Sequence, residues 1–348
     1  MGSAGQAFQA GERGSQAAVP LEVLLPLMRA RGVTISPQAF HAAVNEVFHA
    51  FESTCYDRVH RDMWESLPRQ FELLVSDYLR RHVPKRRLSV LDVGCGTGLS
   101  SELLSRTPLG SYIDAIDLLD TSPEMLEASR RRGIRGARRF IQGTIEDVPL
   151  GPPYDVIVAC SVLHHIPDVS ILTRGVRIRQ TVGGVFLHLQ DPNADYHHDV
   201  ERVRRERAWT ESGAARVRQA LRRVLPSHLV RAGARRLKRS QDRSFIDLIN
   251  EELMRREITR ERMSAAELWS VTDLHEHYAA GISIDTLVEL LPEYELLSRR
   301  SYAFFGELEA NLPRRFRRME QEWITCSAQN GARIGGLWIR KGDPGIHE

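Results

Sequence analysis

The most constraining feature of this sequence is a short apolar run that ends in a glycine-rich turn. Residues 88–93 read Leu-Ser-Val-Leu-Asp-Val, and residues 94–98 read Gly-Cys-Gly-Thr-Gly. A short, mostly apolar run is typical of a buried strand in a parallel sheet. Glycines allow the backbone to turn tightly and to approach a ligand closely. We therefore expect a strand, then a ligand-binding loop, then a helix near residues 98–106.

Apolar runs and helical patterns alternate along much of the remaining chain. Further strands are expected at residues 112–119, 138–142, 154–159, 184–189, 294–298 and 333–339. The helices between them are expected at residues 123–132, 168–180 and 284–291. Alternating strands and helices indicate a doubly wound α/β fold. Together with residues 88–93, these runs predict a mostly parallel sheet of seven strands.

Segments without strand patterns divide the chain. Residues 1–18 are rich in Gly, Ala, Ser and Gln, which predicts a flexible tail. Residues 19–86 have helical periodicity and form a predicted N-terminal cap. The α/β core is expected at 87–192 and 283–348. A charged, helical insertion at 193–282 would follow the fifth strand.

Composition excludes several classes of protein. The 348 residues carry a formal net charge of +3, and no stretch approaches the ~18 consecutive apolar residues of a membrane span. The four cysteines are far apart, so we expect neither a disulfide framework nor a metal site. Nearly all basic residues are arginine, which hints at a bacterium with a GC-rich genome. We expect a cytoplasmic protein that does not bind membranes.

The glycine spacing discriminates between two kinds of cofactor. Dinucleotide sites use the pattern GxGxxG, with a pyrophosphate at the helix N-terminus. Here the pattern is GxGxG, and Leu99 stands where the third glycine would be. Asp92 lies two residues before the first glycine, where its carboxylate would repel a pyrophosphate but attract an ammonium group. The segment from Leu91 to Gly98 resembles motif I of the class I methyltransferases that use S-adenosylmethionine.

This resemblance implies a set of cofactor contacts. Asp92 and the loop of Gly94, Cys95, Gly96 and Gly98 would hold the methionine end of S-adenosylmethionine. After the second strand, Asp120 would accept hydrogen bonds from the ribose hydroxyls, because a carboxylate offers two acceptor oxygens. The other implied contacts are Thr121 and Met125 beside the ribose, Thr144 and Ile145 beside the adenine, and Cys160 near the sulfonium.

Thr144 departs from the family pattern, which has an aspartate at this position. A hydroxyl can still accept a hydrogen bond from the adenine amino group, but the direct contact is less certain. Asp120 could instead cap the following helix, although Ser122 fits that role better.

Histidines after the fourth strand are the candidate catalytic residues. His164 and His165 fall at the carboxyl edge of the sheet, where open α/β sheets bind ligands, and imidazole is a suitable base near neutral pH. A purely structural role for His165 stays open. In the cap, Glu52, Tyr56 and His60 are four residues apart, so one helix would align them. We predict that Tyr56 closes the cofactor site, and that residues 273–278 form a lid with a hinge at Gly281.

The sequence does not identify the molecule that accepts the methyl group. We favour O-methylation of a small natural-product molecule, enclosed by the cap and the insertion. The alternative is an acceptor on a peptide or an acidic carrier protein, docked on residues 202–239, which contain thirteen basic residues. One aromatic residue, Trp209, is too few for a nucleic-acid surface. A cofactor-binding regulator and a dehydrogenase are weaker rivals, and the oligomeric state stays open.

Overall fold

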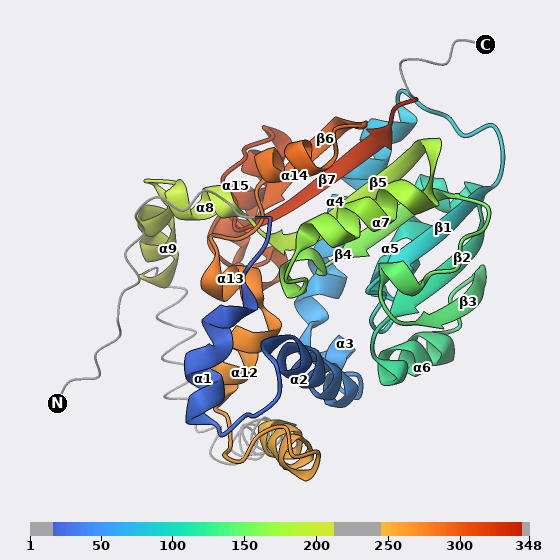
Figure 1. Cartoon of the computed structure of the whole chain (residues 1–348). Coiled ribbons are helices and arrows are strands. Elements are labelled where there is room, and N and C mark those ends of the chain that lie inside the picture. The colour runs from blue at the N-terminus through green and yellow to red at the C-terminus, as the bar shows by residue number, and fades with distance from the viewer. Residues whose placement is uncertain (1–16, 212–244, 343–348) are drawn as a thin grey trace, which may run out of the picture.

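All strands that the structure describes lie in one sheet (Figure 1). The structure is a computed structural model, and it describes residues 17–211 and 245–342. The strand order is β3-β2-β1-β4-β5-β7-β6. The strands are β1 (Leu88–Val93), β2 (Ile113–Asp120), β3 (Ala137–Gln142), β4 (Tyr154–Cys160), β5 (Gln180–Pro192), β6 (Tyr294–Tyr302) and β7 (Arg333–Arg340).

The strand directions confirm the predicted mostly parallel sheet of seven strands. Strands β3, β2, β1, β4 and β5 pair in parallel, and β7 is antiparallel to both β5 and β6. The chain moves from β1 outward to β3, then returns to β4 on the other side of β1. Ligands of open α/β sheets bind outside the carboxyl ends of the strands at such a reversal. The fold therefore places a site where β1 and β4 end.

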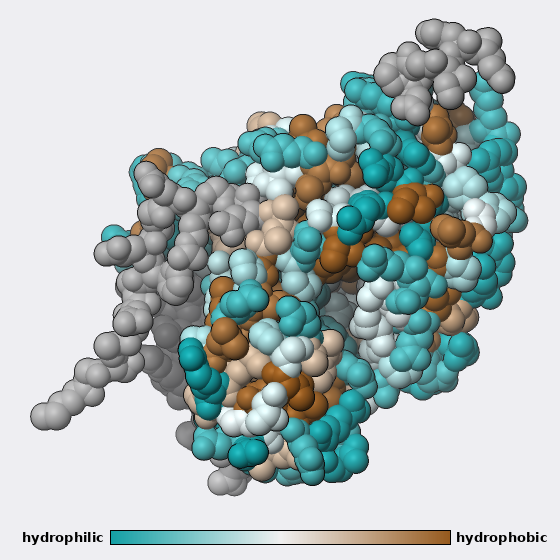
Figure 2. All heavy atoms as spheres, in the orientation of Figure 1, coloured by the Kyte–Doolittle hydropathy of each residue, from teal (hydrophilic) through white to brown (hydrophobic). Residues whose placement is uncertain are grey.

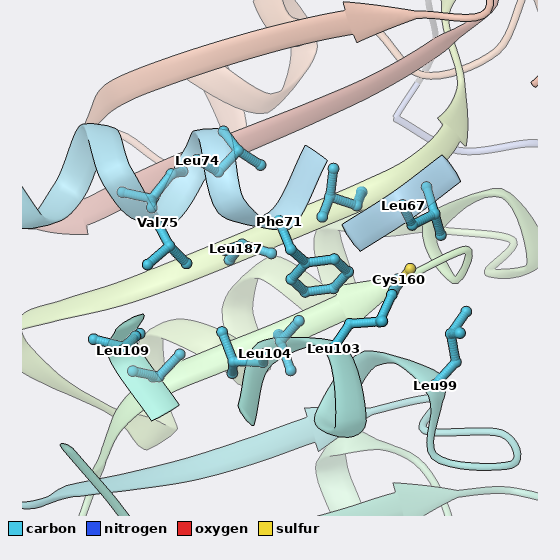
Figure 3. Close-up of a cluster of buried hydrophobic side chains, with 14 of the residues drawn as sticks. Leu67, Phe71, Leu74, Val75, Leu99, Leu103, Leu104, Leu109, Cys160 and Leu187 are labelled. Atoms are coloured by element: carbon cyan, nitrogen blue, oxygen red, sulfur yellow. The ribbon is translucent and has the colours of Figure 1, made fainter. Parts of the chain in front are cut away.

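Helices cover both faces of the sheet. On one face, α4 (Arg61–Leu79) and α5 (Leu99–Arg106) pack on the strands through leucines such as Leu67, Leu74 and Leu103, which are at most 1% exposed (Figure 3). On the other face, α7 (Val169–Arg179) and α14 (Ile284–Leu290) pack on the sheet in a second apolar cluster. All of β4 is buried, as expected for a central strand covered on both faces. The sheet is therefore a rigid support for the loops at its edge.

The predicted cap and insertion meet in a single helical lobe. The lobe contains η1 (Leu21–Leu24), α1 (Leu25–Ala30), α2 (Pro37–Glu52), the helical residues 245–255 and α12 (Ala265–Thr272). Phe40 and Val44 of α2 share one apolar cluster with Leu253 and Leu268 of the insertion. In Figure 1 this lobe lies beside the sheet, and in Figure 2 hydrophobic side chains gather over it. Helix α4 belongs to the sheet layer instead.

One expected helix is broken. Glu52, Tyr56 and His60 do not share a helix, because α2 ends at Glu52 and a separate turn, α3 (Tyr56–Val59), follows. The hydroxyl of Ser53 donates to the carbonyl of Ala50, at 2.7 Å. The hydroxyl of Thr54 likewise donates to the carbonyl of Phe51, at 2.8 Å. Such side chains compete with the helical hydrogen bonds at a helix end.

The predicted N-terminal tail extends over residues 1–18, and its first sixteen residues lie outside the described part of the chain. Ala18 forms an antiparallel bridge with Asp168, and the N–H of Val169 donates to the carbonyl of Ala17. Residues 17 and 18 therefore already contact the start of α7, although the sequence assigned them to the tail.

The remaining described elements connect these layers. They are η2 (Pro108–Tyr112), α6 (Pro123–Arg132), η3 (Ile145–Asp147), η4 (Leu163–His165), α8 (Ala194–His198), α9 (Arg202–Thr210), α13 (Leu274–Tyr278), η5 (Glu309–Asn311) and α15 (Arg314–Thr325). Helix α15, between β6 and β7, is not predicted by the sequence analysis. Most of the basic segment 202–239 lies outside the described residues. Within the described ranges, no helix combines the length and the apolar character that crossing a bilayer requires.

Candidate functional site

A cavity of about 620 Å³ lies at the carboxyl ends of three neighbouring strands. Val93, Asp120 and Cys160, the last residues of β1, β2 and β4, all line it. The helical lobe supplies the opposite wall, with residues from α2 and α12. Most of the residues predicted for the site from the sequence line this cavity: Tyr56, Gly94, Cys95, Gly96, Asp120, Thr121, Met125, Thr144, Ile145, Cys160, His164 and His165.

The glycine-rich loop uses its three glycines in different ways. All three have positive φ, a region that favours glycine. A Cβ at Gly94 would lie 2.6 Å from Val162, and a Cβ at Gly98 would lie 2.4 Å from Ile134, so both glycines are required by packing. A Cβ at Gly96 would meet nothing within 4 Å. Gly96 lines the cavity and is therefore the glycine whose backbone a ligand can approach; Gly98 does not line it.

Asp92 also stays out of the cavity wall. Its carboxylate is fully buried and accepts hydrogen bonds from the hydroxyls of Ser100 and Ser101. Burial raises the pKa of Asp92 to about 6, although both serines act in the opposite direction. Ser100 lines the cavity, so this hydroxyl connects Asp92 to the cavity wall.

Asp120 connects the glycine loop to the second strand. One carboxylate oxygen accepts from the N–H of Gly96 at 2.8 Å, and the other accepts from the N–H of Ser122 at 2.9 Å. Ser122, rather than Asp120, caps helix α6, because its hydroxyl accepts from the N–H of Met125. Burial raises the pKa of Asp120. Asp120 is thus free of a capping role and holds two acceptor oxygens at the cavity wall.

The segment predicted beside the adenine is organised by Asp147. Its carboxylate accepts from both the N–H and the hydroxyl of Thr144, at 2.8 and 3.0 Å, in a capping box that starts η3. The Thr144 hydroxyl retains its own lone pairs, and Ile145 follows as a buried residue of the cavity wall. Glu146 also lines the cavity.

Two non-glycine residues at the cavity have left-handed backbone conformations. Ser161 follows β4 with φ +62°, and Gln190 lies near the end of β5 with φ +70°. The N–H of Ser161 donates to the carbonyl of Leu189, and the Gln190 side chain accepts from the hydroxyl of Tyr302. Such conformations cost about 1–3 kcal/mol and cluster at functional sites. Neither residue has a sequence signal that would have revealed it.

Tyr56, Glu52 and His60 meet at the cavity in spite of the break in the helix. Nε2 of His60 lies 2.9 Å from Glu52, and Nδ1 of His49 lies 3.1 Å from the other oxygen of the same carboxylate. Burial alone would raise the pKa of Glu52, but the two histidines lower it to about 2. The Tyr56 ring packs on His60 with centroids 4.4 Å apart. This cluster holds Tyr56 at the wall of the cavity.

Asp57 fastens this part of the cap to the glycine loop. Its carboxylate accepts from the hydroxyl of Thr97 at 2.8 Å, from the indole N–H of Trp64 at 3.2 Å, and from the guanidinium of Arg132. Arg132 also donates to the carbonyl of Thr97 at 2.6 Å. The sequence analysis did not identify Asp57, because its partners are up to 75 residues away.

His164 is held by a buried aspartate. Its Nδ1 lies 2.9 Å from Oδ1 of Asp191, and its backbone N–H points at the same oxygen, at 3.3 Å. Burial alone would raise the pKa of Asp191, but His164 and His188 hold it well below its usual range, so the aspartate is ionised and accepts. Burial, followed by the charge of His165, lowers the pKa of His164. At neutral pH, Nδ1 of His164 therefore carries the proton and Nε2 carries a lone pair.

His165 has the opposite charge preference. Its Nδ1 lies 2.8 Å from the carbonyl of Thr272 and 3.3 Å from Oδ1 of Asp273. Burial alone would lower the pKa of His165, but Asp273 and the Thr272 carbonyl raise it to about 9. A histidine that is protonated at neutral pH donates hydrogen bonds and cannot act as a base. Of the two candidate histidines, His164 is therefore the one suited to accept a proton.

The other histidines near the fifth strand do not reach the cavity. His188 is fully buried between Phe186 and Trp338. His197 belongs to α8 and contacts Arg202 through its Nδ1, at 2.9 Å. Of the predicted lid at 273–278, Asp273 and Glu276 line the cavity, and Glu276 pairs with Arg333.

Comparison with known proteins identifies the domain that carries this cavity. Residues 91–187, which span the glycine loop, Asp120, Thr144 and both histidines, match the family model described as a methyltransferase domain. Residues 91–187 therefore form a methyltransferase domain. The chain is similar to the ubiquinone biosynthesis O-methyltransferase of Xylella fastidiosa strain 9a5c, with 34% identity over 102 residues. That match covers 28% of this chain and 39% of the relative.

Two further proteins are similar to this chain. The ubiquinone biosynthesis O-methyltransferase of Xanthomonas oryzae pv. oryzae strain PXO99A is 31% identical over 116 residues, or 32% of this chain and 46% of the relative. The plantazolicin methyltransferase BpumL, solved with S-adenosylhomocysteine, is similar with 13% identity and a TM-score of 0.45, over 86% of this chain and 96% of that one. The chain spans less than half the length of these curated relatives.

Proposed function

We propose that this chain is an S-adenosylmethionine-dependent methyltransferase that modifies an oxygen atom of a small natural-product molecule. The observation that carries this proposal is the continuity of the cavity. One space extends from Gly96 and Asp120, on the cofactor side, to His164 and the helical lobe on the other side. Its volume of about 620 Å³ falls in the usual range for small-molecule sites, which is roughly 300–1,000 Å³.

The cofactor side fits S-adenosylmethionine by the chemistry of its donors and acceptors. Gly96 offers open space for a ligand beside the loop, and the two carboxylate oxygens of Asp120 suit a pair of ribose hydroxyls. Tyr56 would close this side from the cap. When bound, S-adenosylmethionine supplies a methyl group on a cationic sulfur, so the protein need supply no methyl donor of its own.

The acceptor side fits a hydroxyl group. The protein must hold the acceptor oxygen in line with the methyl carbon and the sulfur, and such positioning can lower a barrier by about 7–11 kcal/mol. The lone pair on Nε2 of His164 can accept the hydroxyl proton, while the Nδ1–H stays bonded to Asp191. Because the curated relatives are named O-methyltransferases, they also favour oxygen as the acceptor.

A free acceptor is favoured over one carried by an acidic protein. In the described part of the basic segment, arginines of α9 already pair with nearby acids: Arg204 with Glu201, and Arg205 with Asp199. These pairs leave less positive charge for docking a carrier.

The proposal is tested by binding and then by turnover. Isothermal calorimetry should show micromolar binding of S-adenosylmethionine and S-adenosylhomocysteine, and no binding of NAD. An acceptor screen with labelled methyl, using matched phenols, alcohols, carboxylic acids and amines, should then place the label on oxygen. Binding of NAD alone would refute the cofactor assignment, and label confined to nitrogen would refute O-methylation.

A further inference from the structure

Three side chains from distant parts of the chain converge at the wall of the cavity. His164 and His165 belong to η4, after β4, and Asp273 follows α12 in the insertion. Each of the three residues has one potential ligand atom within 4.8 Å of those of the other two. This juxtaposition was not expected, since the sequence analysis predicted no metal site.

Two of these polar atoms lie close together at the cavity wall. Nε2 of His164 carries a lone pair, because its Nδ1–H is donated to Asp191. It lies 3.9 Å from Oδ1 of Asp273, which is also an acceptor. A metal ion between them would accept a lone pair from each.

One distance matches that between two ligands of a tetrahedral metal ion, and a second is about 0.5 Å longer. Bonds of ~2.0–2.2 Å at the tetrahedral angle place two ligand atoms about 3.4 Å apart. Oδ1 of Asp273 lies 3.3 Å from Nδ1 of His165 and 3.9 Å from Nε2 of His164. Without a metal, Nδ1 of His165 donates to the carbonyl of Thr272. Metal binding would release the Nδ1 proton to solvent and replace this hydrogen bond.

One of the three side chains, His164, makes the second hydrogen bond that metal-binding histidines usually make. Such histidines donate their second ring N–H to a carboxylate or carbonyl, which fixes the ring and its tautomer. Asp191, which is fully buried, does this for His164 at 2.9 Å. All three candidate ligands also line the cavity, so a bound ion would keep an open position toward the acceptor.

We propose that His164, His165 and Asp273 bind a divalent transition-metal ion, with Zn²⁺ as the best fit to two imidazoles and one carboxylate. If the proposed function is correct, the open position would bind the acceptor hydroxyl and favour its deprotonated form. The hydroxyl proton would then pass to solvent water, and the oxygen would form its bond to the methyl carbon as the carbon–sulfur bond breaks. Because Asp273 belongs to the insertion, the same ion would also fasten the helical lobe to the core.

The test uses the full-length protein, freed of any affinity tag and stripped with a chelator. Titration with Zn²⁺, followed by calorimetry, should show one site with micromolar or tighter affinity. Titration with Co²⁺ should produce visible absorption bands typical of a four-coordinate site with nitrogen ligands. Asp273→Asn and His164→Ala should each weaken Zn²⁺ binding at least 100-fold. His277→Ala, an exposed histidine four residues after Asp273, should leave it unchanged.

The outcomes separate this proposal from the proposed function. Each variant is first titrated with S-adenosylhomocysteine, because retained affinity shows that the protein is folded and that its cofactor site is intact. If Zn²⁺ fails to bind, or binds equally well to Asp273→Asn, the metal site is refuted while the methyltransferase assignment stands. If Zn²⁺ binds as expected but S-adenosylhomocysteine does not, the metal site stands and the methyltransferase assignment fails.

Discussion

Nδ1 of His164 lies 2.9 Å from Oδ1 of Asp191, and both side chains are buried. The aspartate thereby fixes which nitrogen of the imidazole carries the proton. This leaves the lone pair of Nε2 facing the cavity, where it can take a proton or bind a metal ion. The tautomer of His164 is therefore a property on which catalysis should depend.

Asp191→Asn is expected to lower kcat by about 10²–10⁴-fold, the usual range for loss of a general base. An asparagine can donate to Nδ1, which would move the proton to Nε2 and remove the lone pair from the cavity. Single-turnover kinetics with labelled methyl measure this loss, and calorimetry should show unchanged affinity for S-adenosylhomocysteine. Asp195→Asn, a partly exposed aspartate on α8, is the control. Loss of cofactor affinity equal to the loss of kcat would show that Asp191 is only structural.

Asp120→Asn is expected to weaken binding of S-adenosylhomocysteine by about 10–100-fold. Hydrogen bonds to a charged group contribute about 1.5–3 kcal/mol each, and the amide replaces one acceptor oxygen by a donor. Asp114→Asn is a matched control, because Asp114 is on the same strand but is exposed outside the cavity. Equal dissociation constants for the two variants would remove Asp120 from the cofactor site.

The core and the cofactor side were predictable because their signals are local. The apolar run at 88–93, the spacing of Gly94 and Gly96, and the position of Asp120 are read within short windows, and β1 and β2 bring them together wherever this sheet forms. Ser122 and Met125 follow directly as a capped helix, which the structure contains. Even so, a spacing rule does not show that Gly98 packs on Ile134 rather than lining the cavity.

The acceptor side was less predictable because its contacts join distant segments. Asp273 lies 108 positions after His165, and their pairing depends on how the insertion packs on α2. A pattern of residues four apart also suggested one helix for Glu52 and Tyr56, whereas hydroxyl groups at 53 and 54 end the helix. Tertiary packing decides the first case, and a single sequence carries no local record of it. The helix end is set by local hydrogen bonds, which a pattern of residues four apart does not take into account.

Asp117 should make the stability of the fold depend on pH in the acid range. This buried carboxylate accepts from Arg138, Arg139 and Tyr154. Burial alone would raise the pKa of Asp117, but these donors lower it from 3.8 to about 2. A lowered pKa means that its stabilisation is complete above the unfolded value and is lost as the pH falls from about 4 through 2.

Asp117→Asn is therefore expected to be less stable than wild type at pH 7, by about 1–3 kcal/mol, and the difference should shrink toward pH 2. Urea unfolding at a series of pH values measures this difference. The exposed Asp114→Asn again serves as a control on the same strand. A gap between Asp117→Asn and wild type that stays constant from pH 7 to pH 2 would contradict the role given to this carboxylate.

Gly96→Ala separates ligand binding from backbone strain. Gly96 and Gly133 both have positive φ, +53° and +69°, and a Cβ at either position would meet nothing within 4 Å. Alanine should therefore cost about 1–2 kcal/mol of stability at both sites, from the left-handed conformation alone. Only Gly96 lines the cavity. We expect Gly96→Ala to weaken S-adenosylhomocysteine binding at least tenfold in calorimetry, because the methyl group of this alanine would occupy space that the cofactor needs. Gly133→Ala should bind S-adenosylhomocysteine like wild type. If both variants bind like wild type, the cofactor does not approach the loop at Gly96.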